Sequence, residues 1–151
     1  MLRSALIGLV AGQRAMTPLA ALATAARQGQ LADDAPLVGW LRKPAVAGGA
    51  VVLAALEMAG DKMKSAPDRI VPSGMIARSL TSAYAGAALA PAGKRVAGGA
   101  IALVTALGAS YVGWRLRCAA MRRYGQTSTG FIEDALVLGS GLAIALNGRR
   151  A

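Results

Sequence analysis

The sequence predicts an all-α protein that crosses a membrane several times, and three observations carry this prediction. Hydrophobic residues make up 55% of the 151 residues and charged residues only 16%, whereas aromatic residues, at 4%, are too few for an aqueous core of this apolarity. The apolar residues form continuous runs instead of the alternating pattern of strands. Ala and Gly are abundant in these runs, and such small residues let helices pack closely in lipid.

The first apolar run, residues 4–26, predicts a broken or re-entrant helix. Gly12 permits a break, and Pro18 suits the first position of a new helix, where its missing N–H costs nothing. Thr17, directly before this proline, is a suitable N-cap. We therefore expect two half-helices joined by an irregular segment at residues 13–16.

Four further apolar runs predict four further spans, at residues 45–60, 73–91, 96–114 and 130–147. A bilayer core needs about 20 helical residues, with a range of about 17–25, so each run is short but adequate. The segments between the runs hold prolines and charges, which is typical of connections. The connection at 115–129 is the most basic of them and contains Arg115, Arg117, Arg122 and Arg123.

The four further runs also suggest a duplicated helical hairpin. The sequence VAGGA occurs at 46–50 and at 96–100, and SGMIARSL at 73–80 aligns with TGFIEDAL at 129–136. Because each copy holds an even number of spans, the copies should run the same way through the membrane. The alternative is coincidence between segments rich in Ala and Gly. The predicted organisation is a single membrane domain, 1–151, with a broken helix and loop at 1–43 and hairpins at 46–91 and 96–147.

Lys and Arg are almost evenly divided between the two sides of this predicted topology, so the positive-inside rule sets no direction. Either the chain inserts both ways and forms antiparallel homodimers, or some of its positive charges face an aqueous path. We expect a homo-oligomer in the bacterial cytoplasmic (inner) membrane. Membrane lipids are the expected partners, because anionic headgroups attract basic connections.

The composition argues against several classes of function. The chain has no His, the commonest general base and transition-metal ligand, and its lone cysteine is Cys118, so neither a metal site nor a disulfide is predicted. The net charge of +10 lacks interleaved aromatic residues, which argues against nucleic-acid binding. We predict no catalytic residue and no cofactor. An enzyme acting on a lipid phosphate is a third, weaker alternative, because acids and Arg can bind metal and phosphate.

Ionisable residues within apolar runs are candidates for function. Glu57 and Asp61 are four residues apart and therefore share one helix face. The alternative is that both acids are solvated at the membrane interface, beside Lys62 and Lys64. Arg78 aligns in the proposed repeat with Asp134, which follows Glu133. Opposite charges at equivalent positions predict a buried pair between Arg78 and one of these two acids. Alternatively, the helix dipole alone stabilises acids in a first turn.

The break in the first run predicts a site for negative charge. Irregular backbone at membrane depth is found only where it is buried in protein or lines a watery cavity. There a half-helix N-terminus offers free N–H groups, and Arg14 adds a full positive charge. The occupant is either an anionic solute or one of the chain's own carboxylates. The alternative is a short amphipathic entry at the membrane surface, with Arg14 reaching into the headgroups.

Three segments together resemble a known family: AGQRAMTPLAALA at 11–23, EMAGDKMKSAPDR at 57–69 and FIEDALVLGSGLAIA at 131–145. They are similar to the bacterial membrane family known as domain of unknown function 4126. This sequence departs from the family pattern at Gln13, usually hydrophobic there, and at Lys64, usually Pro there. The resemblance implies a membrane protein without an assigned activity, and it adds the loop residues Lys62, Asp68 and Arg69 to the candidates.

Two functional hypotheses follow. The first is a transporter or channel for a small ionic solute, favouring an anion. The second is a structural or assembly protein whose buried ion pairs fix helix packing and which binds lipid or a larger membrane complex. For both, the candidate ion-binding residues are Gln13, Arg14, Thr17, Glu57, Asp61, Arg78, Glu133 and Asp134.

Overall fold

A computed structural model describes residues 1–61 and 71–147, without the side chains of residues 126 and 127. The prediction of an all-α protein is confirmed for these residues, which form helices joined by turns. The elements are α1 (Leu2–Gln13), α2 (Thr17–Arg27), α3 (Val38–Leu41), α4 (Pro44–Gly60), α5 (Pro72–Leu89), the 3-10 turn η1 (Ala92–Lys94), α6 (Arg95–Tyr124) and α7 (Gln126–Leu146).

Proline and glycine set several of the helix boundaries. Pro18, Pro44 and Pro72 each lie in the first turn of a helix, where a missing N–H leaves no hydrogen bond unmade. Helix α6 ends at Gly125, whose φ of 82° is a conformation that favours glycine. The prediction that residues 115–124 belong to a connection is therefore wrong, because α6 continues through them until this glycine.

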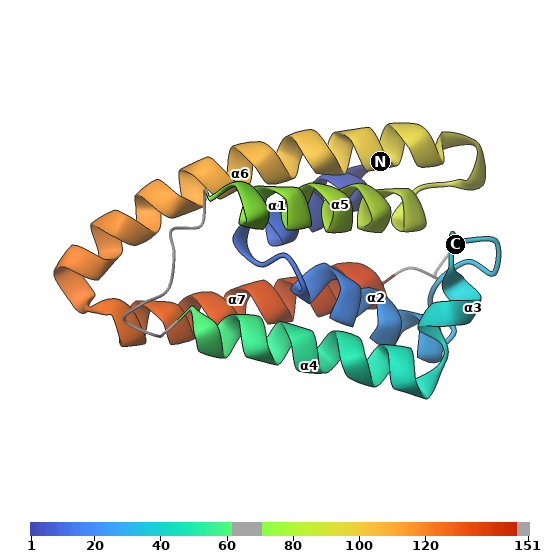
Figure 1. The fold of residues 1–151 in the computed structure, drawn as a ribbon. Helices are drawn as coiled ribbons and strands as arrows, with labels where there is room; N and C mark the ends of the chain where they lie inside the picture. Colours follow the sequence, from blue (N-terminus) through green and yellow to red (C-terminus); the bar gives the residue numbers. More distant parts are fainter. Residues whose placement is uncertain (62–70, 148–151) are drawn as a thin grey trace.

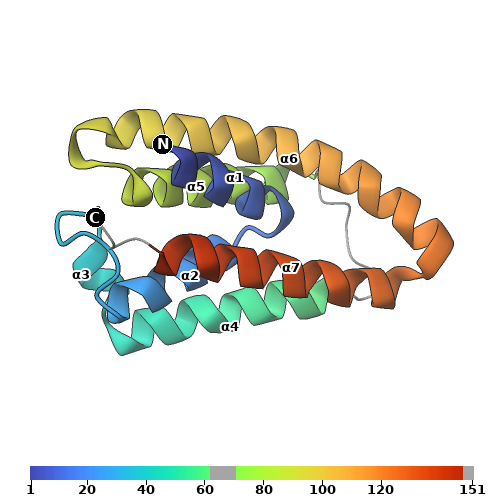
Figure 2. The same cartoon turned by 180° about the vertical axis from the view of Figure 1, so that it is seen from behind.

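The helices form two groups that meet around the break in the first run. Helix α1 packs mainly against α5 and α6, and α2 packs mainly against α7 and α4. In Figures 1 and 2, α4 and α6 both run away from the end that holds α3, and α5 and α7 run back toward it. Helices α1 and α2 run in opposite directions, so the chain turns back on itself between them (Figures 1 and 2).

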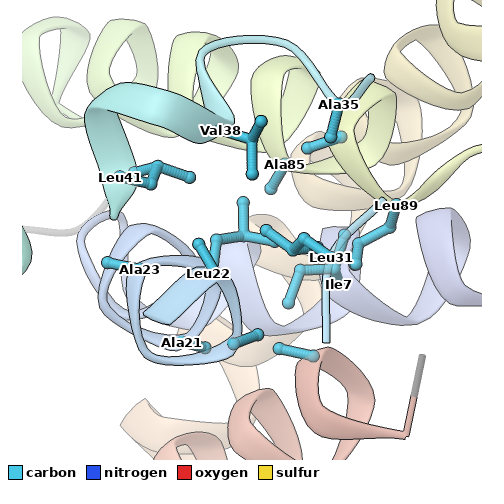
Figure 3. Close-up of a cluster of buried hydrophobic side chains, with 14 of the residues drawn as sticks. Ile7, Ala21, Leu22, Ala23, Leu31, Ala35, Val38, Leu41, Ala85 and Leu89 are labelled. Carbon is cyan, nitrogen blue, oxygen red and sulfur yellow. The ribbon is translucent and has the colours of Figure 1, made fainter. Parts of the chain in front are cut away.

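A cluster of small and aliphatic side chains joins α1, α2, α3 and α5 (Figure 3). Ile7, Leu22 and Leu31 are almost wholly buried in it. Close backbone contacts elsewhere depend on glycine: a Cβ at Gly8 would lie 2.5 Å from the carbonyl oxygen of Ala102. Small residues thus allow helix α1 to approach α6 closely, as expected for helices rich in Ala and Gly.

Several charged side chains are buried in this protein, whereas many large apolar side chains are exposed. Arg14 is only 1% exposed and heads the largest fully buried side chains, whereas Leu80 and Val104 are 68% and 70% exposed. Two of the four further runs, in α6 and α7, are long and apolar enough to cross a membrane, and α4 is a shorter apolar helix. The membrane crossing itself and the full set of four further spans stay predictions.

The two VAGGA segments occupy different environments. In α6, an added Cβ at Gly98 would lie 2.7 Å from the carbonyl oxygen of Gly86, so this copy packs directly against α5. In α4, nothing lies within 4 Å of an added Cβ at Gly48 or Gly49. The shared direction of α4 and α6 fits parallel copies, whereas this difference in packing does not. The duplication therefore stays a prediction.

Candidate functional site

Helix α6 forms hydrogen bonds with the end of α1, directly before the turn between α1 and α2. Arg14 has extended backbone angles, φ −141° and ψ 120°, which end α1. The Ser110 hydroxyl donates a 3.0 Å hydrogen bond to the carbonyl of Gly12, and the Gln13 side-chain amide donates one of 3.0 Å to the carbonyl of Ala109. The Gly12 carbonyl at the end of α1 is thereby satisfied within the protein, as a buried backbone group requires.

Arg14 lies at the centre of the site and contacts two carboxylates. Its Nε and Nη2 both donate to Oδ1 of Asp134 on α7, at 2.9 and 2.6 Å. Its Nη1 lies 2.7 Å from Oδ2 of Asp61, the residue that follows α4. A buried arginine is tolerated only when its charge is compensated and its N–H groups are used. These two acids provide that compensation.

Arg117 on α6 extends these contacts into a chain of alternating charges. Its Nη1 contacts the same Oδ2 of Asp61 that Arg14 contacts, and it lies 3.0 Å from Oε2 of Glu133. Its Nη2 donates to the backbone carbonyl of Asp61 at 3.2 Å. The order of contacts is therefore Asp134, Arg14, Asp61, Arg117 and Glu133, and it links the two helix groups. We refer to these five residues as the ion chain.

The start of helix α2 also receives a carboxylate. Glu57 accepts hydrogen bonds from the backbone N–H groups of Ala15 and Met16, at 2.7 and 2.8 Å, one with each oxygen. Of the two occupants expected for the positive end of this half-helix, the structure contains the internal one. Glu57 therefore serves as the anion at this helix end.

Thr17 differs from its predicted role. It is the first residue of α2 instead of the N-cap, which is Met16, and that cap makes no side-chain hydrogen bond. The Thr17 hydroxyl is buried without a hydrogen-bond partner in the part of the chain that the structure describes. The physical reason is that the helix begins one residue earlier than predicted, and the N–H of Ala20, which an N-cap at Thr17 could bind, already donates to the carbonyl of Met16 at 3.1 Å.

The remaining predicted site residues, Arg78 and the three loop candidates, are not part of the ion chain as defined above. Arg78 is 5% exposed on α5. The acids predicted to pair with it contact other arginines: Asp134 contacts Arg14, and Glu133 contacts Arg117. The predicted pair between Arg78 and one of these acids stays a prediction. The loop candidates Lys62, Asp68 and Arg69 lie outside the described residues.

Arg117 is the site residue that sequence reasoning missed. It was assigned to a connection because four arginines occur within a short segment. The available signal was Gly125, since no proline interrupts the chain between Arg95 and this glycine. A helix extended to Gly125 would have placed an arginine at membrane depth and made it a candidate.

A cavity of about 580 Å³ adjoins the ion chain between α6 and α7. Gln13, Arg117 and Glu133 contribute to its wall. Among the described residues, no group of three or more His, Cys, Asp or Glu side chains is placed to hold a metal ion. A small molecule in this cavity would lie next to the guanidinium of Arg117 and the carboxylate of Glu133.

No family model, curated protein or solved structure matched this chain.

Proposed function

We propose that this protein is a membrane transporter or channel for a small ionic solute, which passes the ion chain. The observation that carries the proposal is the position of the α1–α2 turn. It brings Arg14, 1% exposed, and the start of α2 to three carboxylates between the two helix groups, those of Glu57, Asp61 and Asp134. Half-helix ends and buried ionisable residues are recurring elements of ion pathways through membranes.

The distribution of polarity supports insertion in a membrane. The described surface carries large apolar side chains on several helices, including Leu56 on α4, Leu80 on α5 and Leu136 on α7, each more than 60% exposed. Water would not favour such a surface on a protein in which Arg14, Arg78 and Arg117 are buried. The bilayer interior would, because it takes apolar side chains and excludes uncompensated charge.

The cavity favours a protein that binds a solute over one whose ion pairs serve only to hold its own helices together. It lies beside Arg117 and Glu133, so a bound molecule would reach the ion chain directly. If the solute replaced one internal contact of Arg117 or Glu133, the remaining contacts of the ion chain would change when the solute binds. We further propose that the protein resides in the bacterial cytoplasmic membrane, contacts lipids and forms homo-oligomers, and that it is related to the family named above.

Flux through proteoliposomes tests the proposal. Purified protein is reconstituted, and entry of chloride, phosphate, potassium and choline is measured for wild type, Glu57→Gln and Asp33→Asn. Both variants remove one negative charge, but Glu57 binds the start of α2 whereas the Asp33 side chain is 81% exposed. We expect flux of at least one of these ions, unchanged in Asp33→Asn and reduced about tenfold or more in Glu57→Gln. Equal flux in all three proteins would contradict a pathway past this site.

A second function, as a structural or assembly protein, is favoured by one observation. Arg14 and Arg117 both contact the protein's own acids, and the ion chain links the two helix groups. Such contacts fix helix packing without any solute. Absence of flux for all four ions, together with a partner protein that co-purifies with wild type and is lost with Arg117→Ala, would favour this function.

A further inference from the structure

A groove of about 650 Å³ lies between helices α2 and α4, and its lining changes from polar to apolar along its length. Arg27 and Gln28, at the end of α2, provide the polar part. The apolar part belongs to α4 and includes Gly48, Val51 and Val52. Helix α2 ends and α4 begins at the end of the protein that holds α3 (Figures 1 and 2), so the polar part lies at that end. The groove extends from there to Val51, which is about 10 Å along α4 from its first residue.

The guanidinium group of Arg27 is available to a ligand at the polar end of this groove. An arginine in the last turn of a helix can bind the free carbonyl groups there. The last carbonyl groups of α2 already accept hydrogen bonds of 3.1, 3.2 and 2.8 Å from the backbone N–H groups of Gln28, Gly29 and Gln30. Arg27 itself is exposed, and its side chain forms no hydrogen bond or ion pair within the described part of the chain.

The acids of the first half of the chain leave the charge of Arg27 uncompensated. Residues 1–56 are all described, and Asp33 and Asp34 are the only acids among them. Asp33 pairs with Arg42, and Asp34 pairs with Arg95. A guanidinium group binds phosphate through strong, charge-assisted hydrogen bonds. The polar end of the groove therefore suits a ligand that carries a phosphate.

Trp40 and Lys43 indicate the depth of this end of the protein in a membrane. The Trp40 side chain is 60% exposed, and the Lys43 ammonium group lies 4.1 Å from the centre of the indole ring. Exposed tryptophan and basic residues are typical of the level of the lipid headgroups. Trp40 belongs to α3, at the same end of the protein as the polar part of the groove. Val51 and Val52, 51% and 57% exposed, then lie at the level of the acyl chains.

We infer that this groove binds an anionic phospholipid. The phosphate accepts hydrogen bonds from Arg27 and Gln28, and one acyl chain lies over Gly48 against Val51 and Val52. Gly48 leaves the space for that chain, because nothing lies within 4 Å of a Cβ added there. A zwitterionic lipid would bring a cationic amine close to Arg27, so a lipid with net negative charge binds more tightly. The inference rests on the membrane location included in the proposed function, and it names the lipid partner and its site.

Titration of the purified full chain with two lipids tests the inference. Dioleoylphosphatidylglycerol is anionic, and dioleoylphosphatidylcholine is zwitterionic with the same acyl chains. Bound lipid and oligomeric state are both measured by native mass spectrometry in a neutral detergent. Arg27→Gln removes the charge at the polar end of the groove, and Gly48→Leu fills its apolar part without changing a charge. The matched controls are Lys94→Gln, at an exposed residue outside the groove, and Gly108→Leu, at another exposed glycine with nothing within 4 Å of an added Cβ.

We expect wild type to bind the phosphatidylglycerol about tenfold more tightly than the phosphatidylcholine, a difference of about 1.4 kcal/mol. Arg27→Gln should lose most of this preference, whereas Gly48→Leu should bind both lipids about tenfold more weakly. Both controls should bind the two lipids as wild type does. Circular dichroism shows whether each variant is folded, and the two groove variants act by different means, so one misfolded variant leaves the other as the test.

Two results would overturn the inference. The first is equal binding of the two lipids to wild type, or binding that neither groove variant changes. The second is loss of a dimer in Gly48→Leu with unchanged lipid binding, because the groove would then hold a second copy of the chain.

The outcomes separate this inference from the proposed function. If an ion crosses proteoliposomes but both lipids bind wild type equally, the inference is wrong and the transport function stands. If the phosphatidylglycerol is preferred as expected but no ion crosses, the lipid site stands and the transport function is wrong.

Discussion

Replacement of Arg14 by alanine is the most direct test of the ion chain. The substitution removes the two hydrogen bonds to Asp134 and the ion pair with Asp61, at a position only 1% exposed. Breaking one partner of a buried ion pair costs about 3–5 kcal/mol, because the opposite charge stays buried. We therefore expect Arg14→Ala to lower the free energy of unfolding by about that amount.

The matched control is Arg42→Ala. Arg42 also pairs with an aspartate, Asp33, but the two side chains are 41% and 81% exposed. Exposed pairs contribute only about 0–1 kcal/mol, because water and salt screen them. The difference between the two variants should therefore be at least about 2 kcal/mol, which isolates burial from the loss of an arginine.

Unfolding is followed by circular dichroism in one neutral detergent during titration with a denaturing detergent. A double variant, Arg14→Met with Asp134→Leu, removes both charges and replaces them with apolar side chains of similar bulk. We expect it to recover much of the stability lost in Arg14→Ala, because no charge at that contact stays uncompensated. If Arg14→Ala were as stable as Arg42→Ala, the ion chain would not contribute to holding the helix groups together.

Two further predictions concern other contacts. Gly12→Ala should lower the free energy of unfolding by about 1–3 kcal/mol, because its Cβ would lie 2.6 Å from that of Ala109. Gly108→Ala, with nothing within 4 Å of the added Cβ, should instead raise it by about 0.5–1 kcal/mol in the same titration, because alanine is more stable than glycine in a helix interior. The hydrogen bond from Arg95 lowers the pKa of the Asp34 carboxyl, so this pair stabilises the fold above the ordinary Asp pKa and its contribution is lost as pH falls through the lowered value. An NMR titration should show the pKa of Asp34 rising in Arg95→Ala, and an unchanged pKa would contradict the pairing.

Local sequence signals predicted the elements around the site well. A proline in the first turn of α2 and a flexible Gly12 predict a break, and the structure ends α1 at Gln13 and begins α2 at Thr17. The i, i+4 spacing of Glu57 and Asp61 placed both acids toward the same neighbours, where they contact the turn and Arg14. These features depend on residues close together in the chain, so sequence patterns carry them.

Partner choice and helix length were harder to predict. The contact between Arg14 and Asp134 joins residues 120 apart in sequence, and local sequence patterns give no information on such packing. Arg117 was assigned to a connection because a cluster of arginines is typical of connections. In the structure, Arg117 is a buried residue of the continuous helix α6. Long-range geometry decided the first case, whereas the second depended on a local signal, the uninterrupted segment that ends at Gly125.

Asp61 has a special position in the ion chain, because one of its oxygens accepts contacts from both Arg14 and Arg117. Arg14 belongs to the turn that starts α2, and Arg117 belongs to α6, so this single carboxylate joins the two helix groups. A proton or a competing cation at Asp61 would weaken both ion pairs at once, whereas the same event at Glu133 would weaken only the described contact to Arg117. If binding in the cavity is coupled to movement of the helix groups, Asp61 is the carboxylate at which the coupling should be strongest.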